Sequence, residues 1–259
     1  MKVTILGCGT SSGVPTLTCE CEVCTSTNPK NNRTRCSILI EINRKNILID
    51  TSPDFRQQMM REKVKKIDAI LFTHAHFDHI GGFDDIRAFN YRYGALAIYA
   101  NQKTYEGLKK TFYYAFGELE QKGGGVPESN INIIQNDELF TVFENEIDFV
   151  DVAPIEIIHG KMTVLGFRIG NFAYVTDTNY ISESSLEKLK NLDVLIISAL
   201  RFEKHPTHFT VDEAIEIINK LKPKKAYLTH LAHQINYDTL ENELPENIYL
   251  AFDGLKFEV

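Results

Sequence analysis

The sequence contains no tryptophan, and it lacks any apolar run long enough to cross a bilayer. Its longest purely apolar runs are short, as at 194–197, whereas a membrane-spanning helix needs about 20 apolar residues. Residues 1–7 lack the long apolar region and cleavage site of a signal peptide, and they predict a first strand instead. We therefore expect a cytoplasmic protein without a membrane partner, whose five cysteines act as ligands or buried thiols rather than in disulfides.

Basic residues are also in short supply. Lysine and arginine together number 28 against 35 aspartates and glutamates, which gives a formal net charge of -7. Strong nonspecific binding to nucleic acid needs clustered basic residues, so the composition argues against a nucleic-acid partner. It does not argue against a small anionic substrate, because bound divalent cations would dominate the local field.

The chain has 259 residues, of which 43% are apolar, and this is enough to form a substantial core. We expect a single domain over 1–259, since no low-complexity linker divides the chain. Short segments rich in Ile, Leu and Val predict strands at 2–6, 37–41, 46–50, 69–72, 96–100, 131–134, 146–152, 155–159, 163–169, 172–175, 194–198 and 225–228. With helices between some of them, the pattern predicts an α/β architecture of two sheets inside outer helices.

Two helices are signalled by capping boxes. Ser184 with Glu187, and Thr210 with Glu213, each precede apolar residues at helical spacing. The second helix has an apolar stripe that we interpret as core, formed by Val211, Ala214, Ile215, Ile218 and Leu221.

Residues 101–130 form an irregular insertion rich in aromatic side chains and glycine. One interpretation is an aromatic helix that packs on the core and ends in a glycine loop. The other is a lid or rim over a functional site, because long irregular segments in compact domains are often functional. The sequence leaves both open.

The segment 73–79 concentrates histidine and aspartate as no other part of the chain does. It reads Thr-His-Ala-His-Phe-Asp-His and follows an apolar run. Imidazole nitrogens and carboxylate oxygens are ligands for zinc and related ions. An extended backbone points His74, His76 and Asp78 one way and His79 elsewhere, which suits two adjacent metals. The alternative, a solvated polar loop, does not account for four ligand-type residues in six positions.

Further ligand-type residues follow other predicted strands. His159 ends one strand, Asp177 comes directly after another, and His230 follows the strand at 225–228. Loops at strand ends collect functional groups on a rigid scaffold. Each of these residues alone is weak evidence, and they gain their interpretation from the set.

This set resembles the metallo-β-lactamase superfamily, in which the His-x-His-x-Asp-His motif, a later His, an Asp after a strand and a late His occur in the same order. The resemblance covers essentially the whole chain and implies a four-layer αββα sandwich of two mixed sheets with helices outside. It also implies the ligands of two metals: His74, His76 and His159 for one, Asp78, His79 and His230 for the other, with Asp177 bridging.

Three cysteines, Cys19, Cys21 and Cys24, lie within six residues near the glycine-rich start of the chain. Thiolates at this density suit a structural zinc, which prefers four nitrogen or sulfur ligands, although three incidental reduced cysteines are the simpler alternative. Spacing does not identify the fourth ligand. Cys36 is the nearest cysteine, but it abuts an apolar strand and fits a buried thiol equally well.

The glycine-rich start, the cysteine cluster and a late Thr-His-x-x-His resemble the branch that contains the phosphoribosyl cyclic phosphodiesterase of the carbon–phosphorus lyase pathway. That match implies His233 as the fourth zinc ligand and His208 as a residue that approaches the substrate phosphate or leaving group. The catalytic residues we assign are His208 and Asp78, whereas His205 has no comparable support. We expect Asp50 and Asp54 to orient metal-binding histidines, as carboxylates behind ligands often do.

The expected function is a metal-dependent phosphoric diester hydrolase that acts on a small or cyclic phosphate ester, such as phosphoribosyl cyclic phosphate or cyclic nucleotides. It would use two catalytic divalent metals, Zn or Mn, with a bridging hydroxide, and one structural Zn. His208 as an imidazolium would protonate the leaving oxygen, and Ser11 and Ser12 could add weaker hydrogen bonds. The alternatives are a lactam or thioester hydrolase, a tRNA-processing nuclease and a metal-binding module without turnover. The sequence leaves the oligomeric state open, a homodimer included.

Overall fold

The structure is a computed structural model that describes residues 1–117, 125–143 and 147–259. Within these ranges the strands form two seven-stranded sheets. The first sheet has the order β14-β1-β2-β3-β4-β5-β6, in which the pairs from β14 to β3 are antiparallel and those from β3 to β6 are parallel. Its strands are β1 (Lys2–Gly7), β2 (Ser37–Ile42), β3 (Lys45–Ile49), β4 (Ala69–Leu71), β5 (Leu96–Ala100), β6 (Ser129–Ile133) and β14 (Lys256–Glu258).

The second sheet repeats this pattern in the order β13-β12-β11-β10-β9-β8-β7. Pairs from β13 to β10 are parallel and those from β10 to β7 are antiparallel. Its strands are β7 (Phe140–Val142), β8 (Val150–His159), β9 (Met162–Ile169), β10 (Phe172–Val175), β11 (Val194–Ser198), β12 (Lys225–Thr229) and β13 (Ile248–Leu250).

Both faces of each sheet are buried, with a period of two along the strands. In β2 and β3, Ile38, Ile40 and Ile47 join the core between the sheets, whereas Leu39 and Leu48 face the helices outside. Successive side chains of a strand point to opposite faces, so a strand covered on both sides is a nearly continuous apolar run. This explains why these strands were recognisable in the sequence.

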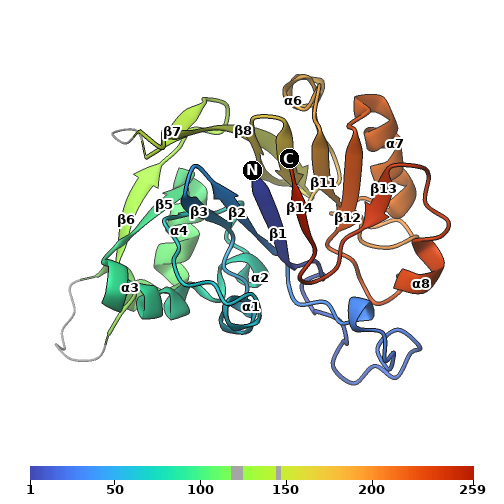
Figure 1. Ribbon diagram of the computed structural model, residues 1–259, viewed down its shortest axis with the longest axis horizontal. Helices are drawn as coiled ribbons and strands as arrows, with labels where there is room; N and C mark the ends of the chain where they lie inside the picture. Colours follow the sequence, from blue (N-terminus) through green and yellow to red (C-terminus); the bar gives the residue numbers. More distant parts are fainter. Residues whose placement is uncertain (118–124, 144–146) are drawn as a thin grey trace.

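Helices cover the outer face of each sheet, and Figure 1 shows them on opposite sides of the molecule. The first sheet is covered by α1 (Phe55–Arg61), α2 (Phe77–Ile80), η2 (Phe83–Ile86), α3 (Arg87–Tyr93), α4 (Gln102–Thr111) and α5 (Tyr113–Phe116). The second is covered by α6 (Glu183–Lys188), α7 (Val211–Leu221) and α8 (Tyr237–Leu240). A short turn, η1 (Pro29–Asn31), lies in the long connection between β1 and β2. The predicted four-layer αββα sandwich is confirmed.

Several details differ from the sequence prediction. The strands predicted at 146–152 and 155–159 are one continuous strand, β8, in which Pro154 is accommodated, and residue 146 lies outside the described residues. The short strands β7, β13 and β14 were not predicted. Helix α6 begins after Ser182, whose side chain accepts from the Ser185 N–H, so Ser182 rather than Ser184 is the N-cap. The Thr210–Glu213 capping box of α7 is confirmed, and so is its apolar stripe.

The described part of the 101–130 segment is helical and packs on the core. Phe112 and Phe116 lie against Phe83, with ring centroids 5.2 and 5.6 Å away. This confirms the interpretation of an aromatic helix over the first sheet. The glycine stretch falls partly at 118–124, outside the described residues, and a lid stays a prediction.

The two ends of the chain meet at one edge of the first sheet, where β1 pairs with β14 (Figure 1). The Met1 ammonium donates to the Val259 carbonyl oxygen over 3.0 Å. Among the described residues, no helix combines the length and the apolar character needed to cross a membrane.

Candidate metal centre

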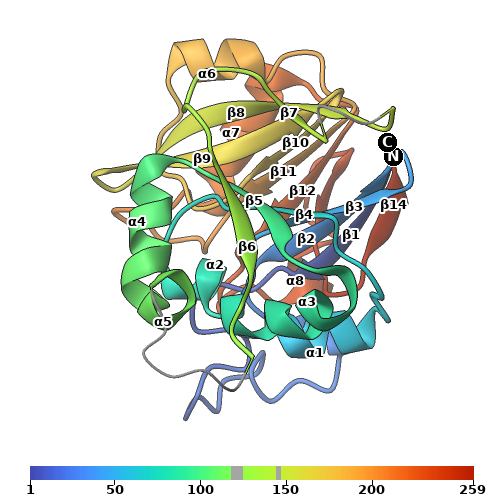
Figure 2. The same ribbon diagram turned by 90° about the vertical axis from the view of Figure 1, so that its left-hand side faces the viewer.

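Five strands deliver their C-terminal ends to one edge of the sandwich. In the first sheet β3 and β4 are parallel, and in the second β8, β10 and β12 run in the same direction because β9 is antiparallel to both β8 and β10. The residues that follow or end these strands are Asp50, the segment 73–79, His159, Asp177 and His230. Figure 2 shows this end of the two sheets between α4 and the loops of the second half.

Three of these residues adopt a left-handed backbone although none is glycine. The φ angles of Asp50, Asp177 and His230 are 62°, 52° and 59°. Such conformations cost about 1 kcal/mol or more each for ordinary residues and concentrate at functional sites. Each one lies within two residues of the end of its strand.

The first cluster contains His74, His76, His159 and Asp177. One ligand atom from each residue lies within 4.8 Å of the others. His74 Nε2 is 3.9 Å from Asp177 Oδ2. The rings of His74 and His76 are 4.6 Å apart, and those of His76 and His159 are 5.1 Å apart. These four residues therefore lie together, as the sequence predicted.

The second cluster contains Asp78, His79, Asp177 and His230, again within 4.8 Å of one another. Asp177 Oδ1 lies 3.3 Å from His79 Nε2 and 3.3 Å from His230 Nε2. Asp78 Oδ2 is 3.3 Å from His79 Nε2 and 3.7 Å from His230 Nε2. Asp177 belongs to both clusters through its two oxygens, which is the arrangement expected of a bridging carboxylate.

Several buried imidazole nitrogens of these clusters have no hydrogen-bond partner in the described parts of the chain. His74 Nε2, His79 Nε2 and His230 Nε2 are all shielded from solvent without a hydrogen bond. Buried polar atoms are nearly always satisfied, so several orphans aimed at one point call for a ligand. A set of imidazole nitrogens around two carboxylates fits a pair of divalent cations.

The pKa shifts of His74 and Asp177 favour the protonation states that bind cations. Burial, and then the neighbouring His79, hold the pKa of His74 well below its usual value, so its ring is neutral and has a lone pair to share. Burial acts to raise the pKa of Asp177, but the imidazoles of His230 and His79 outweigh it and hold that pKa well below the usual range. Neutral imidazole and ionised carboxylate are the forms that bind metal.

A hydrogen-bonded chain behind the clusters orients two of the rings. Asp50 Oδ2 lies 2.7 Å from His79 Nδ1 and accepts from Thr73 Oγ1 over 2.8 Å. Thr73 Oγ1 is in turn 3.0 Å from His74 Nδ1. With Nδ1 of both rings donating into this chain, both Nε2 atoms are left for a cation. Asp50 thus orients histidines as predicted. Thr73 had no predicted role, although it is the first residue of the 73–79 segment.

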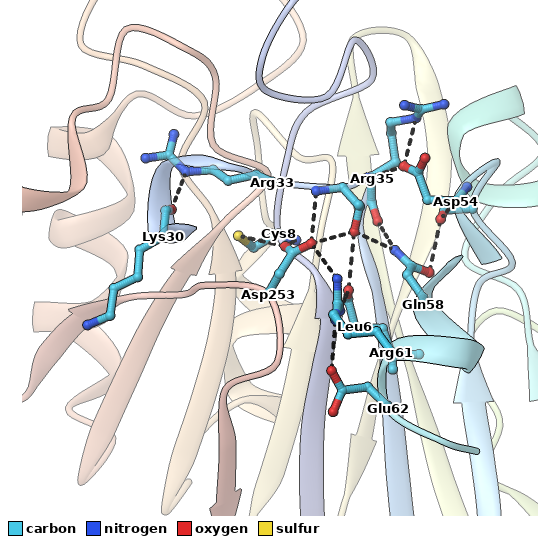
Figure 3. Close-up of polar contacts among 12 residues, drawn as sticks. Leu6, Cys8, Lys30, Arg33, Arg35, Asp54, Gln58, Arg61, Glu62 and Asp253 are labelled. Carbon is cyan, nitrogen blue, oxygen red and sulfur yellow. Dashed lines mark hydrogen bonds and ion pairs between the residues drawn. The ribbon is translucent and has the colours of Figure 1, made fainter. Parts of the chain in front are cut away.

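Asp54 does not share this role, and that prediction is wrong. Its carboxylate accepts from the Arg35 backbone N–H over 2.8 Å and pairs with the Arg35 side chain, as Figure 3 shows. It stands at the start of α1, five residues after the end of β3, the strand that delivers Asp50, and faces the β1–β2 connection.

A third cluster brings three cysteines of the loop after β1 together with His233, which follows β12. His233 Nδ1 lies 3.2 Å from Cys19 Sγ, 3.4 Å from Cys21 Sγ and 3.7 Å from Cys24 Sγ. Three sulfurs around one imidazole nitrogen are the donor set of a closed zinc site. His233, rather than Cys36, therefore completes this cluster.

Cys36 and Cys8 are buried thiols away from that cluster. Cys36 Sγ contacts the Gly9 carbonyl and Thr229 Oγ1, and burial raises the pKa of its thiol to about 12. Cys8 Sγ donates to the Ala251 carbonyl over 3.4 Å. Both positions match the sequence interpretation of ordinary core thiols.

His208 lies against the metal clusters. Its ring stacks on His230 with centroids 4.6 Å apart, and it is 4.7 Å from the ring of His159. Its Nδ1 is buried without a partner. His205 lies closer to the site than the sequence suggested, with its ring 5.2 Å from His208. Burial, followed by the charge of His230, lowers the pKa of His208 to about 3, so the ring is neutral here and not the imidazolium that we expected.

A hollow of about 220 Å³ opens beside His74 and His76, between α4 and the start of β9. Among its described lining residues Lys103 is the one lysine or arginine, and its ammonium has no hydrogen-bond or ion-pair partner in the described ranges. Ser11 and Ser12 are exposed in the first loop, and the Ser12 hydroxyl bonds locally to Gly13 and Thr16. Nothing in the sequence singles out Lys103, since a lysine in the first turn of a helix is common.

Comparison with known proteins agrees with the geometry. A family model described as a β-lactamase superfamily domain matches residues 45–231, which include the 73–79 segment and every residue of the first two clusters. The chain belongs to the metallo-β-lactamase superfamily of hydrolases. A solved structure titled as a new diphosphatase from the PhnP family is 40% identical and superposes with a TM-score of 0.91, covering 100% of this chain and 97% of that one. The resemblance to that branch is confirmed.

Other relatives differ in name. An octanoyltransferase of Porphyromonas gingivalis is 38% identical over 99% of this chain, but the chain spans only about half (51%) of that protein's length. The exodeoxyribonuclease WalJ of Streptococcus pneumoniae is 23% identical, covering 86% of this chain and 88% of that one. Zn²⁺-bound PqqB from Methylobacterium extorquens has a TM-score of 0.79 over 100% of both chains at 18% identity, which shows the shared fold. The superfamily fold implies divalent metals, and the two catalytic clusters are where this chain would hold them.

Proposed function

We propose that the protein is a cytoplasmic phosphohydrolase that cleaves small anionic phosphodiesters, cyclic or linear. We include diphosphates in which one phosphorus is bonded both to an ester oxygen and to the oxygen that links the two phosphorus atoms. The observation that carries the proposal is Asp177, shared by two ligand clusters, with His208 stacked directly beside them. The likeness to a 40%-identical diphosphatase supports attack at phosphorus. The negative net charge disfavours a long nucleic acid as substrate.

Two groups of residues would bind metal, one in a catalytic pair of sites and one in a structural site. His74, His76, Asp78, His79, His159, Asp177 and His230 would hold two divalent metals, Zn or Mn. Bound there, such a pair supplies an activated water near neutral pH and polarises a phosphoryl oxygen. Cys19, Cys21, Cys24 and His233 would hold one structural Zn.

His208 acts next to the reacting phosphorus in this proposal. Its ring is neutral in the buried site, and it would donate an N–H to a phosphoryl or leaving oxygen. A phosphoryl oxygen beside the ring favours the protonated form, because a nearby negative charge raises the pKa of a histidine. Proton delivery to the leaving oxygen is then coupled to substrate binding.

The test is a substrate panel with the purified protein reloaded with Mn or Zn. It contains bis-p-nitrophenyl phosphate, a ribose cyclic phosphate, 2′,3′- and 3′,5′-cyclic nucleotides and a dinucleoside diphosphate. We expect turnover of at least one of these, and loss of that turnover in Asp177→Asn with the fold intact. No phosphoester turnover in the fully metallated protein would overturn the proposal.

Acyl substrates form the second arm of the panel. The octanoyltransferase relative motivates an octanoyl thioester, and nitrocefin represents the lactams. That relative is about twice as long as the matched region, so its name describes a larger protein. Turnover of the thioester at a rate above that of every phosphoester would replace the proposed function with an acyl hydrolase.

A further inference from the structure

Arg33 is a buried arginine whose side chain meets neutral oxygens. Only 1% of its surface is exposed. Its guanidinium donates to the Lys30, Ala232 and Ile235 carbonyl oxygens over 3.3, 3.0 and 2.7 Å. It also donates to Asn31 Oδ1 over 2.9 Å. None of these partners in the described structure is a carboxylate, so its charge has no direct ion pair.

Two of the four oxygens flank a proposed zinc ligand. The carbonyls of Ala232 and Ile235 lie one residue before and two residues after His233, and the fork of Arg33 holds both. The planar guanidinium presents its donors in a fixed geometry, so two carbonyls bound to it are fixed relative to each other. We call residues 232–235 the His233 turn.

The backbone of Arg33 holds the other half of the cluster. Arg33 N donates to the Val14 carbonyl over 2.7 Å, and Val14 N donates back over 2.9 Å. Val14 packs with Val23 and Cys24 in a small apolar cluster that also includes Cys19. One residue therefore ties the cysteine loop, residues 14–24, to the turn that presents His233.

The segment between His230 and His233 is fixed on its other side as well. Leu231 N donates to the Cys8 carbonyl over 2.8 Å, and Thr10 N donates to the Leu231 carbonyl over 3.2 Å. Figure 3 shows Cys8 beside Asp253. The Asp253 carboxylate forms an ion pair with Arg61 and accepts a hydrogen bond from the Thr34 hydroxyl. Asp253 is thus already paired, and the cation at Arg33 remains to be balanced.

Charge supplies the second argument. Three thiolates and a neutral imidazole around a divalent zinc carry a net charge of about -1, from three negative and two positive charges. A buried cation without a counter-ion is costly, and so is a buried anion. Burial lowers the pKa of Arg33, and the neighbouring acidic groups Cys8, Asp253 and Cys24 oppose this, so they favour the charged form of the guanidinium.

We propose that Arg33 is the positioning residue of the Cys19–Cys21–Cys24–His233 site, where it sets His233 against the three sulfurs and balances the charge of the filled site. This role goes beyond the proposed phosphohydrolase activity and does not depend on it. It requires only that the third cluster binds zinc.

The experiment measures zinc at this site in Arg33→Met, Arg33→Lys and Arg61→Met. Arg61 is the control, because its side chain, 31% exposed, bonds Asp253, Glu62 and the Leu6 carbonyl but does not touch the His233 turn. Zinc affinity is obtained by competition with a chromogenic chelator. Cobalt substitution gives a thiolate-to-cobalt absorption band that reports this site alone, since the catalytic clusters contain no sulfur.

Arg33→Met should bind zinc about tenfold to a hundredfold more weakly and shift or weaken the cobalt–thiolate band. Arg33→Lys keeps the charge but cannot hold both carbonyls, so its loss should be smaller and at least about threefold. Arg61→Met should stay within about twofold of the wild type, with the same band.

Wild-type affinity and spectrum in a folded Arg33→Met protein would overturn the assignment. If that variant does not fold, unchanged affinity in Arg33→Lys overturns it instead. An equal loss in Arg61→Met would show general destabilisation and would also overturn it. A wild type that hydrolyses phosphodiesters but lacks a cobalt–thiolate band would refute the zinc site and this role while leaving the proposed function standing.

Discussion

Asp50 and His79 form a buried pair in which carboxylate Oδ2 and imidazole Nδ1 are 2.7 Å apart and neither side chain is exposed. His79 points its other nitrogen at Asp78 and Asp177. Burial acts to lower the pKa of His79, but Asp177, Asp78 and Asp50 outweigh it and raise that pKa well above its usual value. The surplus of negative charge around this ring shows how strongly the site favours a cation.

Replacing Asp50 should weaken the catalytic metals. In Asp50→Asn the hydrogen bond that fixes His79 and the Thr73–His74 chain loses its charge, and we expect metal affinity to fall about tenfold to a hundredfold. The measurement is hydrolysis as a function of added Mn or Zn. Asp54→Asn is the matched control and should respond like the wild type, because Asp54 pairs with Arg35. Identical metal curves for the wild type and Asp50→Asn would contradict the role.

His208 and its neighbour His205 can be separated by mutation. His208→Gln should lower kcat about 100-fold or more while the metal content stays constant, because the ring contacts the ligands His159 and His230 without joining either cluster. His205→Gln should cost less than about fivefold, since His205 contacts His208 and Thr207 and belongs to neither ligand cluster. Steady-state kinetics would give kcat for each variant, and metal analysis would give its metal content. A lost metal ion in His208→Gln would reassign that residue as a ligand.

Lys103 should contribute to substrate affinity. In the proposed function an anionic group of the substrate reaches the hollow beside His74 and His76, where Lys103 is unpaired among the described residues. Lys103→Met should raise KM about tenfold at unchanged kcat, as the loss of one charged hydrogen bond predicts. Lys109→Met, in the last turn of the same helix, is the control. An unaffected KM would place the substrate on another side of the metals.

Glu62 gives a pH-dependent contribution to stability. Burial acts to raise its pKa, but hydrogen bonds from Lys256 and Arg61 outweigh it, and the net shift is downward. A lowered folded pKa stabilises the fold above the unfolded value of about 4.3, and this stabilisation is lost as the pH falls through the folded value. Glu62→Gln should therefore lower Tm by a few degrees at pH 7 (about 1 kcal/mol) and by less near pH 3.

Thermal unfolding monitored by circular dichroism at both pH values tests this. Glu187→Gln removes an exposed ion pair with Lys190 and should leave Tm nearly unchanged at both. A Tm loss in Glu62→Gln that is the same at pH 7 and pH 3 would show that charge is not the cause.

The sequence predicted the layers of the fold because strands buried on both faces are apolar throughout, as Ile38, Leu39 and Ile40 illustrate. It could not predict β13 and β14, which are three residues long and depend on their neighbours for pairing. Short strands have no periodicity of their own to detect. The break predicted before 155 failed because Pro154 occupies a position in β8 that tolerates the missing N–H.

The candidate site was more predictable than its supports. Ligand-type side chains such as His74 and Asp177 identify themselves by residue type and by their place after strands. Arg33 and Thr73 do not, because their roles come from contacts across more than twenty residues of sequence, as between Thr73 and Asp50 or Arg33 and Ala232. Asp54 had the right residue type in the right segment but turned toward Arg35.

The hydrogen bonds between Met1 and Val259 have a practical consequence for protein engineering. Because β1 leads from this pair toward the Cys8–Thr10 loop beside the metal clusters, its six residues separate the two by about 20 Å. A short linker could close the chain into a ring, and new ends could be opened in the exposed turn at Gly170 and Asn171. Such a circular permutant would keep every ligand loop uncut.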